Sequence, residues 1–225
     1  MGSRAAKEAL FEAQASVAKA LASGRRAEIV DLLAQGERSV EDVASEIDQS
    51  MANTSHHLRT LARAGLLQSR RDGTRVLYGL ASDRVAQLWS AIREVAAGHV
   101  AEVQRLAQAY LGDGDGLEPL SREELARGLE TGDVVVIDVR PPLEFVAGHV
   151  VGARSMPIDT LERHLDAIPV DVGVVAYCRG PYCVYADDAV RTLRARGFHA
   201  RRLEDGFPEW RRAGLPVAVG EGEFA

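Results

Sequence analysis

The spacing of apolar residues divides the chain into a helical first part and a second part in which strands and helices alternate. Up to about residue 110 the apolar positions mostly recur every three or four residues, the period of an amphipathic helix. We expect helices over 7–23 and 25–35, a third that begins after residue 39, a fourth over 50–64 and a long one over 82–110. From Leu66 to Leu80 the pattern alternates around Asp72-Gly73, which predicts a β-hairpin with a two-residue turn.

Polar residues mark where these helices begin and end. Ser39 stands three residues before Asp42, a spacing typical of a capping box at a helix start. Ser50 is expected to cap the fourth helix, and Gly65 to end it. Helix, helix, tight turn, helix and hairpin is the element order of a winged helix-turn-helix.

The second part of the chain has a different pattern. The runs 134–139 and 172–177 are short, β-branched and almost continuously apolar, as expected of buried parallel strands. Helical segments are expected over 121–130, 160–167, 184–196 and 207–213. Strands that alternate with helices predict an α/β domain with a parallel sheet.

Glycine alternates with aspartate over 111–117, which predicts a linker between the two parts. A chain of 225 residues is long enough for two domains of about 100 residues each. We therefore predict two domains, a mainly-α winged helix-turn-helix over 1–111 and an α/β domain over 117–221.

The composition of the chain indicates where in the cell the protein is expected to be found. No apolar run approaches the roughly 20 residues that a membrane helix needs, and the N-terminal segment does not have the pattern of a secretory signal. The two cysteines, five residues apart, do not form a disulfide framework of the kind found in secreted proteins. We expect a cytoplasmic protein that does not associate with membranes.

A basic cluster stands out against the net charge of −6. Residues 50–80 hold five arginines and a single acidic residue, Asp72, which suggests contact with a phosphate backbone. Residues 50–67 also resemble the recognition helix of ArsR/SmtB-type repressors, whose pattern is Ser-x-x-x-x-Ser-x-His-Leu-x-x-Leu-x-x-Ala-Gly-Leu, followed by a wing. The resemblance covers about 8–110. A solvated helix face with a charged hairpin is the alternative explanation of the cluster.

The resemblance implies double-stranded DNA as a partner. Leu58, Leu61 and Leu66 would anchor one face of the helix, while polar side chains on the other face project toward base edges and phosphates. Arginines on the hairpin would contact backbone or minor groove. The expected DNA-contacting residues are Ser50, Met51, Asn53, Ser55, His56, Arg59, Arg70, Arg71 and Arg75. The family is dimeric, so the resemblance also implies a homodimer and an inverted-repeat operator.

Many members of that family sense metals, but this chain lacks the corresponding residues. The segment 39–49 holds no cysteine, and the long helix offers only His99 and Glu102. We therefore predict no metal site and no cofactor.

The segment 176–189 carries the strongest chemical signal. Cys178 follows a predicted strand and precedes a predicted helix, so backbone N–H groups and the positive end of the helix dipole face its sulfur. Both features lower the pKa of a thiol, and the thiolate is the nucleophilic form. The other cysteine, Cys183, lies in the same loop.

Three segments together resemble the rhodanese, or sulfurtransferase, domain. They are 137–157, which contains Asp-Val-Arg and Gly-His-Val-Val-Gly-Ala, the loop 177–183, and the closing segment 206–217. The resemblance implies that Cys178 accepts a sulfane sulfur from thiosulfate or a persulfide. It also implies that Arg179 supplies positive charge for an anionic donor, and that Asp138 and Arg140 connect the first segment to the loop.

The remaining loop residues would contribute backbone amides to the site; they are Gly180, Pro181, Tyr182 and Val184. Cysteine phosphatases of related fold need Cys-x5-Arg, because the arginine clamps the phosphate oxygens. Val184 stands six positions after Cys178, so the sequence excludes phosphatase chemistry.

Cys183 departs from the pattern of simple rhodaneses, which often carry a small residue there. As a second thiol it would resolve a persulfide or sulfenic acid on Cys178 into a bridge, or it would only pack under the loop. We predict a DNA-binding repressor that responds to reactive sulfur or redox state through Cys178. The alternatives are a sulfurtransferase with an accessory DNA-binding or dimerisation module, and a metal-responsive repressor with a vestigial rhodanese domain.

Overall fold

The protein is described here by a computed structural model that covers residues 3–112, 118–169 and 171–221. The chain divides into two compact units, Met1–His99 and Val100–Ala225. Most of the expected linker, residues 113–117, lies outside the described residues, and the domain limits predicted from the sequence remain a prediction.

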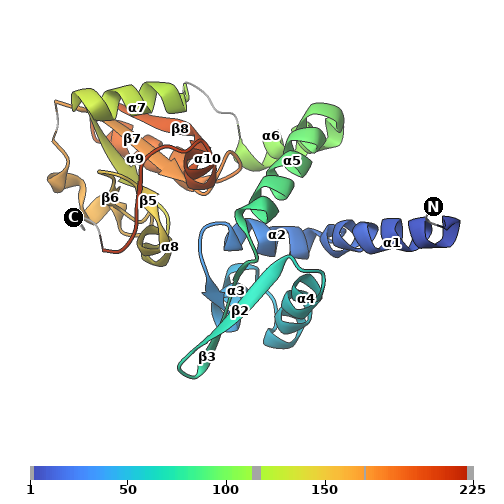
Figure 1. The fold of residues 1–225 in the computed structure, drawn as a ribbon. Coiled ribbons are helices and arrows are strands. Elements are labelled where there is room, and N and C mark those ends of the chain that lie inside the picture. The colour runs from blue at the N-terminus through green and yellow to red at the C-terminus, as the bar shows by residue number, and fades with distance from the viewer. Residues whose placement is uncertain (1–2, 113–117, 170, 222–225) are drawn as a thin grey trace. The chain divides into compact units, whose positions relative to one another are not determined.

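The first unit is a helical bundle with a small antiparallel sheet (Figure 1). Its helices are α1 (Arg4–Leu21), α2 (Gly24–Leu33), α3 (Val40–Glu46), α4 (Met51–Arg63) and α5 (Asp83–His99). The core forms where α2, α3 and α4 meet, because Ile29, Val43 and Leu58 are all fully buried there. The anchoring role predicted for Leu61 and Leu66 is confirmed, since both are buried in the same cluster.

The expected hairpin is present, with its turn one residue later than predicted. Strands β2 (Leu67–Asp72) and β3 (Arg75–Leu80) pair in antiparallel fashion, and β1 (Arg38–Ser39) joins the outer side of β3. Asp72 pairs with Arg75, so the turn is Gly73-Thr74. Gly73 has φ of 59°, which only glycine and a few polar residues adopt readily, and this fixes the turn at that position.

Both predicted helix starts are confirmed. The Ser39 hydroxyl accepts a hydrogen bond from the Asp42 amide at 3.1 Å, and Asp42 accepts one from the Ser39 amide, which completes the capping box. The Ser50 hydroxyl accepts from the Asn53 amide at 3.3 Å. These contacts fix where α3 and α4 begin, and therefore the direction of α4.

The prediction of a single long helix over 82–110 is wrong. The chain forms α5 and then α6 (Ala101–Leu111), separated at Val100, whose backbone is extended. Gly98 lies two residues before the break, and glycine costs a helix about 1 kcal/mol relative to alanine. The apolar periodicity continues through the break, so the sequence pattern alone does not reveal it.

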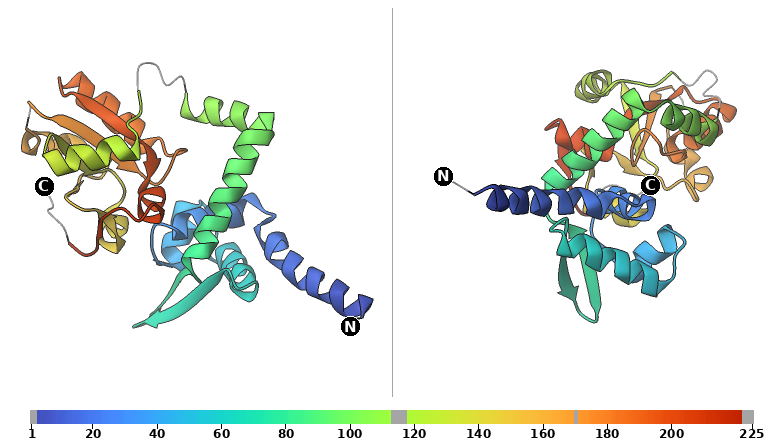
Figure 2. Two further views of the ribbon diagram at one scale, coloured as in Figure 1. Left: turned by 45° about the horizontal axis from the view of Figure 1, so that its top comes forward. Right: turned by 90° about the vertical axis from the view of Figure 1, so that its right-hand side faces the viewer.

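The second unit is an α/β domain around a parallel four-stranded sheet (Figures 1 and 2). The strand order is β6-β4-β7-β8, with all pairs parallel. The sheet strands are β4 (Val134–Asp138), β6 (Arg154–Ser155), β7 (Gly173–Cys178) and β8 (Ala200–Gly206); β5 (His149–Val150) and β9 (Val217–Ala218) form a separate antiparallel pair. The predicted parallel sheet is confirmed, although β8 was missed because its residues are mostly polar.

Helices cover both faces of this sheet. Alternate residues of β7 point to opposite faces, so Val174 and Ala176 pack against α9 while Val175 and Tyr177 join the cluster on the other face. The helices are α7 (Arg122–Thr131), α8 (Pro142–Ala147), α9 (Tyr185–Ala195) and α10 (Phe207–Arg212). The helix expected over 160–167 forms two short 3₁₀ turns, η1 (Leu161–Arg163) and η2 (Leu165–Ala167). No helix among the described residues is both long enough and apolar enough to cross a membrane.

Candidate functional site

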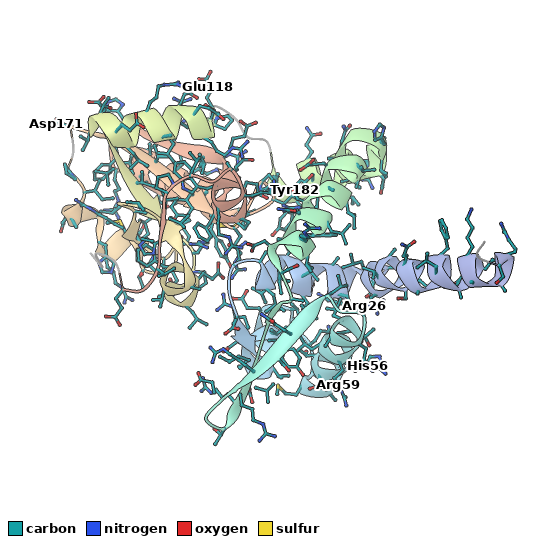
Figure 3. The ribbon with its side chains drawn as sticks, viewed as in Figure 1. Arg26, His56, Arg59, Glu118, Asp171 and Tyr182 are labelled. Atoms are coloured by element: carbon teal, nitrogen blue, oxygen red, sulfur yellow. A yellow bond between two sulfur atoms is a disulfide. The ribbon has the colours of Figure 1, made fainter. Side chains whose placement is uncertain are left out.

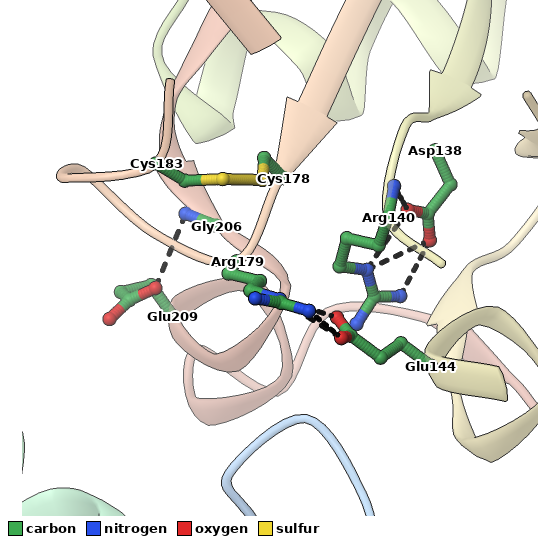
Figure 4. The surroundings of a disulfide bond; sticks show 8 residues. All are labelled: Asp138, Arg140, Glu144, Cys178, Arg179, Cys183, Gly206 and Glu209. Atoms are coloured by element: carbon green, nitrogen blue, oxygen red, sulfur yellow. Dashed lines mark hydrogen bonds and ion pairs between the residues drawn. A yellow bond between two sulfur atoms is a disulfide. The ribbon is translucent and has the colours of Figure 1, made fainter. Parts of the chain in front are cut away.

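Cys178 is the last residue of β7, at the carboxyl end of a central strand of the parallel sheet. The chain then turns and enters α9 two residues after Cys183. A disulfide joins Cys178 and Cys183 across this turn (Figure 4). The only two cysteines of the chain are therefore oxidised together within one loop.

The two sulfur-bearing residues differ in burial. Cys178 is 2% exposed and belongs to the buried cluster between the sheet and α9. Cys183 is half-buried and packs against the edge of that cluster. Cys183 is therefore the more exposed of the two cysteines.

Arg179, the residue after Cys178, is held by a carboxylate that the sequence analysis did not name. Its Nε donates to both oxygens of Glu144 at 2.9 and 3.2 Å, and its Nη2 donates to Oε1 at 2.6 Å (Figure 4). Glu144 is fully buried on α8. The positive charge that we expected Arg179 to offer an anionic donor is therefore balanced at short range.

Asp138 and Arg140 form a second, fully buried ion pair. Arg140 donates through Nε and Nη2 to the Asp138 carboxylate, and through Nη2 to the Gly148 carbonyl at 2.7 Å. Burial alone would lower the pKa of Arg140, but the Asp138 carboxylate raises it above its ordinary value. The pair ties the end of β4 to the turn that precedes β5.

Tyr177 completes this buried network from the strand that carries Cys178. Its hydroxyl donates to Asp138 Oδ2 at 2.6 Å and accepts from the Val150 amide at 3.1 Å. Burial, followed by the nearby Asp138 charge, raises the pKa of Tyr177 well above its ordinary value. Tyr177 thus remains a hydrogen-bond donor throughout the neutral range and fixes the end of β7.

The closing segment supports the loop from the end of β8, the strand beside β7. Cys178 lies opposite Gly206 in the β7–β8 register, and a Cβ at position 206 would lie 2.3 Å from the Gly180 amide nitrogen and 2.4 Å from the Arg179 carbonyl carbon. Glu209 accepts a hydrogen bond from the Gly206 amide at 3.2 Å (Figure 4). Only glycine lets β8 approach the cysteine loop this closely.

Fewer backbone amides of the loop can donate hydrogen bonds to a sulfur ligand than the sequence suggests. The Cys183 amide donates to the Gly180 carbonyl at 3.1 Å, so it does not point at a sulfur ligand. Pro181 has no amide proton. Tyr182 and Val184 are half-buried in the same loop, and Val184 is the residue before α9.

In the first unit, α4 presents the predicted polar face. Met51, Asn53, His56 and Arg59 are exposed, and Ser55 is half-buried. Figure 3 shows His56 and Arg59 on the outer side of α4. They line an open depression of about 540 Å³ together with Ala62 and Arg63. Arg63 was not among the predicted contacts, although it lies one helical turn beyond Arg59 on the same face.

His57 points the other way, toward the body of the unit. Its Nδ1 is buried and has no hydrogen-bond partner among the described residues. Burial, and then the charge of Arg26, lowers the pKa of His57. Of the two adjacent histidines, only His56 therefore lies on the exposed face of α4.

The three arginines of the hairpin are not equivalent. Arg70 donates to Glu37 at 2.7 Å, whereas among the described residues no carboxylate pairs with Arg71 or Arg75. The last two therefore carry the positive charge of the wing. In the described part of the chain, no group of three or more histidine, cysteine, aspartate or glutamate side chains is placed to hold a metal ion.

Comparison with known proteins finds a matching family for each of the two units. Residues 23–69 match the model of the arsR family of bacterial regulatory proteins, and residues 121–213 match the rhodanese-like domain model. The HTH-type transcriptional regulator Rv0324 of Mycobacterium tuberculosis is 46% identical over 214 residues, covering 95% of this chain and 94% of that one. A protein of Allochromatium vinosum named sulfurtransferase is 32% identical over 105 residues, 46% of this chain and 96% of its own.

A solved structure of the homodimeric winged helix-turn-helix DNA-binding domain (fragment 1–100) of Mb0332 from Mycobacterium bovis is also similar. It is 43% identical, covers 44% of this chain and 93% of its own, and gives a TM-score of 0.42.

Fold and sequence thus define a winged-helix transcriptional regulator joined to a rhodanese-like domain. The chain belongs to the ArsR family of helix-turn-helix regulators.

Proposed function

We propose that this regulator binds an operator with an affinity that depends on the sulfur state of Cys178 and Cys183. The observation that carries the proposal is the disulfide between the two cysteines of the rhodanese-like loop. A disulfide holds the turn before α9 in one geometry, whereas two separate sulfurs leave it free to adopt another. The loop therefore has two chemical states on which a regulator can depend.

Reactive sulfur converts the reduced loop into the disulfide by a balanced reaction. The Cys178 thiolate takes the outer sulfur of a persulfide RSSH and releases the thiol RSH. The Cys183 thiolate then attacks Sγ of Cys178, a new S–S bond forms, and hydrosulfide leaves with the electron pair. The two thiols are oxidised to the disulfide, and the sulfane sulfur is reduced to hydrosulfide.

The DNA-contacting surface is proposed to be the outer face of α4 together with the wing. Asn53 and Ser55 lie in the first half of α4, where side chains of a recognition helix reach base edges. His56, Arg59 and Arg63 continue the same face and would contact phosphates. Arg71 and Arg75 would extend the phosphate contacts along the hairpin.

A homodimer on a two-fold operator fits the apolar surface of the first unit. Leu10 and Phe11 on α1 are 56% and 59% exposed, and Val95 on α5 is 61% exposed. Figure 2 shows α1 extending away from the other helices of its unit. Side chains of this size are rarely left in water along two helices, and a second copy would cover them.

The test is an operator titration with three proteins: wild type, Cys178→Ser and Cys183→Ser. Each is measured reduced, oxidised and after treatment with polysulfide, and mass spectrometry of the same samples reports how much sulfur was loaded. We expect wild type to change its operator affinity by about 5–150-fold between states, the usual range of allosteric coupling, and Cys178→Ser to show no change. Equal affinities for all states of the wild-type protein would contradict the proposal.

A sulfurtransferase is the second candidate, favoured by the 32% identity to the Allochromatium protein over the rhodanese-like part. That enzyme would transfer sulfur from Cys178 to an acceptor thiol, with the first unit serving for localisation or dimerisation. Thiocyanate formation from thiosulfate and cyanide measures this activity. Strong turnover that depends on Cys178, without specific DNA binding, would favour the enzyme over the sensor.

A further inference from the structure

The disulfide in the loop is asymmetric, and we infer that it is opened from one side only. A small thiol attacks Sγ of Cys183, forms a mixed disulfide there, and releases Cys178 as the thiolate. Cys183 is thus a site of modification by low-molecular-weight thiols, while Cys178 remains the nucleophile. This inference rests on the proposed function, in which the same two sulfurs carry the signal.

Burial determines which sulfur is attacked. A thiolate displaces a disulfide sulfur along the extension of the S–S bond, from the side opposite the leaving sulfur. Cys178 belongs to the buried cluster that includes Ile137 and Ala186, and only 2% of the residue is exposed, so a thiol has little access to its sulfur. Cys183 lies in the loop and is half-buried, so it is the more accessible of the two cysteines.

The reaction balances without any further component. The attacking thiolate RS⁻ forms a bond with Sγ of Cys183, the Cys178–Cys183 bond breaks, and its electron pair remains on Cys178. The thiol is oxidised to one half of the mixed disulfide, and Cys178 is reduced. A second thiol that attacks the adduct at its outer sulfur then frees Cys183 and completes the reduction.

The direction of attack is measured on the oxidised full-length protein with glutathione as the probe. Aliquots are quenched at early times with acid and N-ethylmaleimide and then digested with trypsin. Cleavage after Arg179 separates Cys178, in the peptide 164–179, from Cys183, in the peptide 180–191. We expect the glutathione adduct on 180–191 and the maleimide on 164–179. The reverse pattern should be at most about one tenth as abundant.

The same reaction in denaturing urea is the matched control. Both sulfurs are then open to solvent, so the adduct should divide almost evenly between the two peptides. An even division in the folded protein, an adduct mainly on 164–179, or a disulfide that glutathione does not open would each overturn the inference. The measurement involves no DNA, so a directional opening combined with a flat operator titration would reject the proposed function alone.

Discussion

Glu144 binds the guanidinium of Arg179, the residue after Cys178, with both of its carboxylate oxygens. The carboxylate is fully buried on α8, whereas the arginine side chain is 18% exposed. The pair therefore fixes the direction of the loop and removes its net charge at the same time. A rhodanese-like loop with a neutralised arginine should discriminate little between neutral and anionic reagents.

Glu144→Gln should restore that discrimination. In a Cys183→Ser background Cys178 is the only cysteine, and its alkylation by anionic iodoacetate and neutral iodoacetamide is compared. The rate ratio of iodoacetate to iodoacetamide should rise about fivefold, because one unbalanced charge in the loop contributes about 1 kcal/mol in a high dielectric. Arg179→Gln is the matched control and should lower the ratio. An unchanged ratio in both variants would show that the pair does not set the charge of the loop.

Gly206→Ala should distort the cysteine loop. The new methyl group would lie within 2.5 Å of three backbone atoms of Arg179 and Gly180, and backbone cannot rotate away as a side chain does. Overpacking of this kind costs about 1–3 kcal/mol or more. Gly173→Ala in β7 is the control, since its nearest new contacts are 3.6 and 3.8 Å. Urea unfolding should give a clear loss of stability for Gly206→Ala only; equal losses would contradict the close approach.

Both folds, and the place of the cysteine loop between a strand and a helix, could be predicted from local sequence, because caps, turns and β-branched runs are encoded by neighbouring residues. Ser39 with Asp42 is such a case, and so is Cys178 at the end of an apolar strand. The break at Val100 was missed because apolar periodicity continues through it. Glu144 was missed for a different reason: its partner lies 35 residues away, and sequence spacing does not indicate which carboxylate reaches Arg179.

Tyr177 predicts a pH dependence of stability at the alkaline end. Its pKa is raised in the folded state, so its contribution is complete below about pH 10, the pKa of an unfolded tyrosine, and is lost as pH rises further. Wild type should lose about 1.4 kcal/mol per pH unit more than Tyr177→Phe above that point. Urea unfolding of the oxidised proteins from pH 9 to pH 11 measures the difference, and parallel curves would reject this role for Tyr177.

The ion pair between Arg70 and Glu37 makes the three wing arginines distinguishable by salt dependence. Each phosphate contact that is lost reduces the slope of log affinity against log salt by about one. Arg71→Ala and Arg75→Ala should therefore each reduce the slope by about one, whereas Arg70→Ala should change it less, because its charge is already balanced. Glu37→Gln should then strengthen binding at low salt. Operator titrations at several salt concentrations test this, and equal slopes for all three arginine variants would mean that the pair with Glu37 opens on DNA.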